Sequence, residues 1–78
     1  MQAQNLKSIL KDKGISCKEI VRRQGGFAVR GIRFAGDPEM QARMAAIAIT
    51  GQGYSFDVRT VERNGQTHYQ FHIQRVQR

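Results

Sequence analysis

Apolar and polar residues alternate over residues 54–76, on both sides of Asn64-Gly65. A period of two is typical of a β-strand with one buried face, and Asn-Gly favours a two-residue hairpin turn because both residues tolerate positive φ. Such a turn pairs Arg63 with Gln66 and fixes the register of the whole hairpin. In this register the mostly apolar face holds Tyr54, Phe56, Val58, Thr60, Tyr69, Phe71 and Ile73. The polar face holds Ser55, Asp57, Arg59, Val61, His68, Gln70, His72 and Gln74.

An earlier hairpin is predicted from strand-like residues 15–22 and 27–34, joined across Gln24-Gly25-Gly26. The glycine pair supplies the turn. The apolar pattern changes phase within this hairpin. One parity is shared by Ile15, Cys17, Val21, Phe27 and Val29, and the other by Ile32 and Phe34.

Two explanations of this phase change remain open. A bulge at Gly31 would switch the faces of the strand. Alternatively, the hairpin is regular and places Phe27, Val29 and Ile20 on its outer face.

Apolar residues at helical spacing predict a short amphipathic helix near the N-terminus. The stripe of Leu6, Ile9 and Leu10 places this helix over roughly residues 3–13, and Gly14 is suited to end it. Asn5 is a candidate cap for its first turn.

A second helix is predicted to begin at Asp37-Pro38 and to end at Thr50, before Gly51. Asp is a favourable N-cap, and Pro suits the first turn because it lacks an N–H. Its predicted buried stripe consists of Met40, Met44, Ile47 and Ala48.

This order predicts a single α+β domain over residues 1–78, with a four-stranded antiparallel sheet and both helices packed on one face. The order helix, strand, strand occurs twice. An offset of 39 residues places Gly25-Gly26 on Asn64-Gly65. We therefore predict an αββαββ tandem pseudo-repeat with units 1–36 and 37–78. The offset also favours the regular form of the first hairpin.

Charge narrows the range of partners. The 78 residues include 13 Lys and Arg against 6 Asp and Glu, giving a net charge of +7. Such a basic balance favours a polyanionic partner, above all DNA or RNA. The single Cys17 excludes an internal disulfide and suits a reducing compartment. With no signal-like or membrane-spanning apolar run, we expect a cytoplasmic protein without a membrane partner.

No catalytic or cofactor motif is visible, so we expect a non-enzymatic protein without cofactor or metal. His68 and His72 lie on one face of a predicted strand. Four residues at ~3.3 Å each separate them by about 13 Å, which is too far to share a metal ion. A local pair between His72 and the opposite Asp57 is the simpler expectation.

We expect nucleic acid to bind the polar sheet face and the two basic hairpin tips. One exposed aromatic, Phe27 in the regular register, could stack a base of a single strand. The candidate residues are Lys18, Arg22, Arg23, Phe27, Arg33, Arg59, Arg63, His68, Gln70, His72 and Gln74.

The alternative is a protein-binding inhibitor or adaptor that acts on a nucleic-acid-handling machine, such as phages and other mobile elements encode. The exposed sheet or an edge strand would then dock a protein. A homodimer is compatible with either function, because a chain this short forms only a small core.

Overall fold

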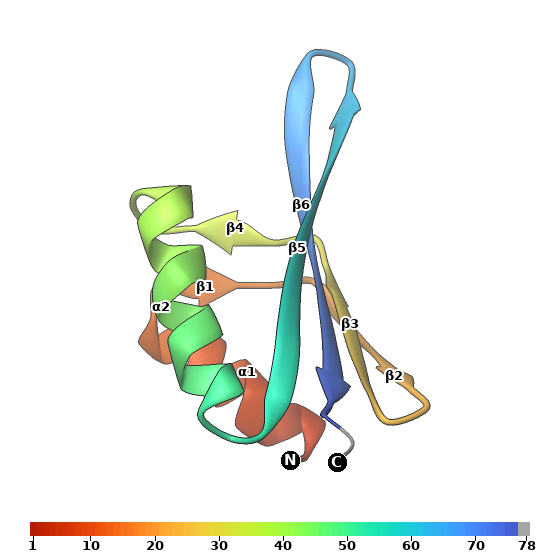
Figure 1. Cartoon of the computed structure of the whole chain (residues 1–78). Helices are drawn as coiled ribbons and strands as arrows, with labels where there is room; N and C mark the ends of the chain where they lie inside the picture. Colours follow the sequence, from red (N-terminus) through yellow and green to blue (C-terminus); the bar gives the residue numbers. More distant parts are fainter. Residues whose placement is uncertain (77–78) are drawn as a thin grey trace.

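The computed structural model describes residues 1–76, which form two helices and six strands (Figure 1). The helices are α1 (Ala3–Asp12) and α2 (Pro38–Thr50). The strands are β1 (Ile15–Ser16), β2 (Glu19–Arg23), β3 (Gly26–Arg30), β4 (Arg33–Phe34), β5 (Tyr54–Arg63) and β6 (Gln66–Arg75). The fold is therefore α+β, as the sequence predicts. Neither helix is long and apolar enough to cross a membrane.

The main sheet is antiparallel, with strand order β2-β3-β6-β5, and β1 and β4 form a separate two-stranded sheet. The register predicted for β5 and β6 is confirmed along the whole hairpin, from Arg63 opposite Gln66 to Phe56 opposite Ile73. Asn64 and Gly65 both have positive φ, at 52° and 75°, as the turn requires.

The first hairpin differs from its prediction in two ways. Arg23 pairs with Gly26, so Gln24 and Gly25 form the turn, one residue earlier than the glycine pair. The hairpin is also interrupted where Gly31 adopts a φ of 65°. The N–H of Lys18 there donates to the carbonyl oxygens of Arg30 and Gly31, both at 3.2 Å.

This interruption explains the change of phase. Ile15 pairs with Phe34 and Glu19 pairs with Arg30, so both strands contribute the same number of residues to the gap. No extra residue of a bulge is present, yet Ile15 of β1 and Ile20 of β2, an odd and an even position, both pack in the core. The chain therefore switches faces at Gly31 without the predicted bulge. The pairing is regular, but the placement of Phe27 and Val29 on the outer face, predicted for the regular hairpin, is wrong.

The side of the main sheet that meets the helices, the core face, carries the bulky apolar residues of β3 and β6. The rows Val29–Phe71–Val58 and Phe27–Ile73–Phe56 run across it. Phe71 is fully buried and packs edge-on against Phe34 and at a tilt against Phe56, with centroids 6.2 and 4.7 Å apart. Phe27 is only 4% exposed, so its predicted exposure is wrong.

Both helices pack on the core face. Leu6 and Leu10 of α1 and Ala45 and Ile49 of α2 belong to the same buried cluster as Phe71. The helix α1 begins after Gln2, without a side-chain cap, so the predicted cap Asn5 is wrong.

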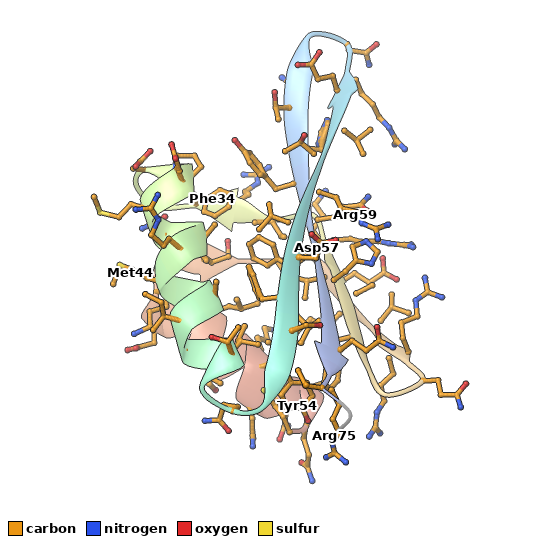
Figure 2. The ribbon with its side chains drawn as sticks, in the orientation of Figure 1. Phe34, Met44, Tyr54, Asp57, Arg59 and Arg75 are labelled. Carbon is orange, nitrogen blue, oxygen red and sulfur yellow. The ribbon has the colours of Figure 1, made fainter. Side chains whose placement is uncertain are left out.

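The bounds of α2 agree with the prediction, but the buried side does not. The Asp37 carboxylate accepts a hydrogen bond from the Met40 N–H at 3.2 Å, which confirms the N-cap. Met40, Met44 and Ile47 are 61%, 44% and 68% exposed. Figure 2 shows Met44 pointing away from the sheet. The smaller face around Ala45 and Ile49 packs instead, because small side chains let the helix approach the sheet closely.

The turn end of β5 and β6 projects beyond both helices (Figure 1). We refer to residues 59–70, which lie beyond the last pair of β3 with β6, as the two-stranded arm. Strand β3 pairs with β6 only as far as Phe71, so the arm has no further strand beside it. The arm contributes to the elongated shape, whose principal extents are 40, 22 and 20 Å.

Phe27 is buried and Met44 is exposed, the reverse of what the sequence predicts, and the effect of each side chain on stability should follow its observed position. Phe27→Ala should lower the free energy of unfolding by about 3–5 kcal/mol, because it leaves a cavity in the core. Met44→Ala, on the exposed side of α2, should change it by about 0.5 kcal/mol or less. Urea unfolding of dilute protein measures both. A larger loss from Met44→Ala than from Phe27→Ala would contradict this packing.

Candidate nucleic-acid interface

The side of the main sheet opposite the helices, the outer face, is covered by neither helix. Figure 2 shows Asp57 and Arg59 on this side of the hairpin. The cross-strand register arranges its residues in rows. Two rows cross the whole sheet, Arg23–Gly26–Gln74–Ser55 and Val21–Ala28–His72–Asp57. Beyond the last pair of β3 with β6, the pair Glu19–Arg30 is followed by Gln70–Arg59 and His68–Val61 of the second hairpin, and Arg30 and Gln70 line the same hollow.

The middle of the outer face is depressed, because the β3 residues there have small side chains. Gly26 and Ala28 are buried there, and a Cβ at Gly26 would collide with the Ile73 carbonyl oxygen of β6. Longer polar side chains surround them. A shallow hollow of about 410 Å³ results, with Arg23, Arg59, Ser55, His72 and Gln74 in its lining.

A second shallow hollow, of about 430 Å³, continues the outer face onto the arm. Arg30, Arg63, His68 and Gln70 contribute to its lining. Together, the two hollows give a surface with guanidinium, amide and imidazole groups along its length. These groups suit phosphate oxygens and base edges.

One of these cations, Arg59, forms an ion pair with a carboxylate of the outer face. Arg59 Nε lies 3.3 Å from Asp57 Oδ2, with both side chains more than half exposed. An exposed ion pair contributes little and is screened by salt, so a phosphate can displace Asp57 at small cost. His72 is opposite Asp57, as predicted, but the carboxylate pairs with Arg59.

The structure brings together most of the predicted site residues. Arg23, Arg59, His68, Gln70, His72 and Gln74 lie on the outer face, and Arg63 continues it at the tip of the arm.

Four candidates lie elsewhere. Phe27 is in the core, and Arg22 shares the row of Phe27 at the exposed edge of β2. Arg33 belongs to the small sheet, and Lys18 lies in the interruption between β1 and β2. The predicted place of Phe27 and Arg22 on the outer face is wrong, because the faces of β2 and β3 are the reverse of those in the prediction. Arg33 and Lys18 lie off the outer face because β1 and β4 form a separate sheet.

Sequence reasoning missed Arg30. It lies on the outer face next to Gln70, because its neighbour Val29 pairs with Phe71 on the core face. The signal was present in β3 itself. Bulky Phe27 and Val29 alternate with small Gly26 and Ala28, which marks the face that Arg30 shares.

A third hollow, of about 150 Å³, lies at the base of the sheet, at the end away from the arm. Arg22, Arg23 and Arg75 line it together with Tyr54, and no carboxylate of the described residues does. Hydrogen bonds from the N-terminal ammonium and from Arg75 lower the pKa of Tyr54. The guanidinium of Arg75 lies 6.0 Å from the centroid of the Tyr54 ring. Arg75 was also missed.

The two hairpin tips lie at opposite ends of the sheet, since β3 is antiparallel to β6 and Gly26 lies opposite Gln74. From Gln74 to the arm tip at Gln66 is eight residues, or about 26 Å at ~3.3 Å per residue. The two tips are therefore too far apart to contact adjacent phosphates. They can contact phosphates about eight base pairs apart.

The described residues show neither a reactive thiol nor a cluster of metal ligands. Burial raises the pKa of the half-buried Cys17 thiol, against the opposing effect of Lys7, whereas reactive thiols have a lowered pKa. Within residues 1–76, no three His, Cys, Asp or Glu side chains lie close enough to hold a metal ion.

No protein-family model, curated protein or solved structure matches this chain. Its function must therefore be inferred from the charge and geometry of its own surface.

Proposed function

We propose that this chain is a non-enzymatic nucleic-acid-binding protein whose outer face is the binding surface. The observation that carries the proposal is the gathering of Arg23, Arg30 and Arg59 on a sheet face that no helix covers. Among the described residues, only Arg59 of these three forms an ion pair with a carboxylate. Guanidinium groups without a carboxylate partner attract phosphates, and the net charge of +7 supports this attraction.

The base hollow extends this surface. Three arginines, Arg22, Arg23 and Arg75, converge there beside the Tyr54 hydroxyl, in a volume that suits one phosphate group. Arg23 also lines the first hollow of the outer face, so the two sites are continuous. We assign the arginines to phosphates and the amides and imidazoles of Gln70, His72 and Gln74 to base edges.

The aromatic residues favour a mode of binding without stacked bases. By register, Phe27, Tyr54, Phe56, Tyr69 and Phe71 belong to the core face, and Phe34 packs against Tyr69 and Phe71. Tyr69 also borders the second hollow, but its ring packs edge-on against Phe34 with centroids 5.0 Å apart. Proteins that bind single strands without sequence preference use exposed aromatic rings for stacking. The suggestion that Phe27 stacks a base is therefore not retained.

A salt titration with matched arginine variants tests this proposal. Binding to duplex DNA and to RNA should weaken steeply with salt, because neutralised phosphates release their counterions. Arg30→Ala should reduce the slope of log K against log salt by about one unit. Arg43→Ala removes the same charge from α2, where Arg43 faces solvent and pairs with Glu39, and should leave that slope nearly unchanged. No binding at low salt, or equal effects of the two variants, would contradict the proposal.

One observation favours a protein contact as a second function. Met40, Met44 and Ile47 form an exposed apolar stripe along α2, at positions i, i+4 and i+7. Exposed apolar stripes commonly mark protein interfaces. Met44, in the middle of the stripe, points away from the sheet (Figure 2), so a protein bound there leaves the outer face free.

We infer that a second copy of this chain covers the stripe. Residues 37–50 carry Asp37 and Glu39 against Arg43, for a net charge of −1 in a chain whose total is +7. Two copies can therefore meet at α2 without bringing their basic surfaces together. A homodimer would also present two outer faces to one nucleic acid, which raises affinity by multivalency.

Sedimentation velocity at increasing protein concentration tests this dimer. The unmodified chain should shift from monomer to dimer, and Ile47→Glu should remain monomeric at every concentration, since it places a charge in the interface. Ser8→Glu, an exposed change of the same charge on α1, is the matched control and should dimerise. A wild-type chain that stays monomeric would exclude the second copy and return the stripe to the adaptor or inhibitor function.

We retain the internal duplication of an αββ unit as a proposal. The turns Gln24-Gly25 and Asn64-Gly65 support it at a spacing of 40 residues, one more than the sequence offset. The central position of β3 and β6, one strand from each hairpin, is compatible with a pseudo-two-fold axis between them. A cytoplasmic location, as expected from the sequence, agrees with a nucleic-acid partner.

A further inference from the structure

The two faces of the arm, residues 59–70, differ in chemistry. Its outer side carries three cross-strand pairs, and its inner side carries two pairs beyond Val58. The outer pairs are Arg59–Gln70, Val61–His68 and Arg63–Gln66. The inner pairs are Thr60–Tyr69 and Glu62–Thr67. The outer side thus holds two arginines and no carboxylate, whereas the inner side holds the only acid of the arm, Glu62.

The outer side of the arm carries the residue types that discriminate base pairs. Arg59 and Arg63 can donate two hydrogen bonds to the O6 and N7 atoms of guanine. Gln66 and Gln70 can form two hydrogen bonds with the N6 and N7 atoms of adenine, and the apolar Val61 can contact the methyl group of thymine. These groups lie on three successive rows of one ribbon.

The shape of the arm suits a groove. Its two strands lie about 4.8 Å apart, and four residues separate Gln70 from Gln66, a length of about 14 Å. The major groove of B-form DNA is about 12 Å wide and about 8.5 Å deep, and it admits a two-stranded β-ribbon. The two-residue turn adds little bulk at the tip, where Arg63 through His68 are all exposed.

We infer that the arm enters the major groove of double-stranded DNA and reads base edges with its outer side. This inference rests on the proposed function and narrows its substrate to a B-form duplex. The major groove of A-form RNA is too narrow for side chains to read, and the outer-face rows contain no Phe, Tyr or Trp on which a single strand could stack. Arg23 and Arg30, on the body of the outer face, contact the phosphates that border the groove.

The experiment compares binding of the intact chain to three probes by fluorescence anisotropy at fixed salt. The probes are a DNA duplex enriched for binding from a random-sequence pool, one of its strands alone, and a duplex RNA of the same sequence. The DNA duplex is also treated with dimethyl sulfate, which methylates guanine N7 in the major groove. The unmodified duplex should bind about tenfold more tightly than the other two probes, and methylation should weaken binding by about tenfold.

Matched variants at the tip locate the contact. Arg63→Ala combined with Gln66→Ala changes the outer side of the tip, and Glu62→Gln combined with Thr67→Ala changes its inner side. All four residues are exposed, so both double variants should fold. The outer variant should lose most of the sensitivity to methylation, because it removes Arg63, one of the two arginines that can donate to guanine N7, together with Gln66. The inner variant should retain the full sensitivity to methylation.

The possible results separate this inference from the function beneath it. DNA binding that is insensitive to methylation, or preference for the single strand or the RNA, would overturn insertion of the arm and leave the outer face as the binding surface. Equal loss of methylation sensitivity in both variants would overturn the assignment to the outer side. Absence of binding to all three probes would overturn the proposed function itself.

Discussion

The pairing of β3 with β6 joins the two hairpins into one sheet and determines which residues face the helices. It joins the two hairpins through only four residue pairs, from Gly26–Gln74 to Val29–Phe71. Phe27 and Val29 face the helices in this register, and Gly26 and Ala28 face outward. Gly26 is required for the close approach, since any side chain would meet the β6 backbone. Because this pairing ends at Phe71, β5 and β6 continue beyond it as the arm, without β3 beside them.

The second hairpin could be predicted almost completely from the sequence. Asn64-Gly65 permits a tight turn, and the alternation around it agrees with only one register, so local chemistry determines both. The bounds of α2 follow in the same way from Asp37, Pro38 and Gly51. The residues that β5 and β6 contribute to the candidate interface could therefore be predicted from the sequence as well.

The faces of β3 and α2 could not be predicted, because they depend on contacts between distant residues. The switch at Gly31 inverts β2 and β3 relative to β1 and β4, and this inversion buries Phe27 and exposes Arg30. On α2, hydrophobicity favoured burial of Met40 and Met44. The packing selects Ala45 and Ile49 instead, and the larger side chains remain exposed. Both errors concern the face by which a strand or helix packs against its neighbours. Neither error concerns the position of the strand or helix in the sequence.

The resulting molecule separates two kinds of surface. The outer face and the arm carry cations and amides on one side of the sheet, and α2 carries an exposed apolar stripe on the other side. The helices and the core face lie between them. A nucleic acid and a second copy of the chain could therefore bind at the same time, and neither would displace core residues.

A two-dimensional ¹H–¹⁵N NMR titration with a short DNA duplex tests the central claim most directly, because each backbone amide reports on its own surroundings. The largest shift changes should fall on the outer-face residues of β3, β5 and β6 and on the arm, including Arg30, Arg59 and Gln70. The amides of α2 around Ile47 should change little. Shift changes centred on α2, with the outer face unaffected, would contradict the account.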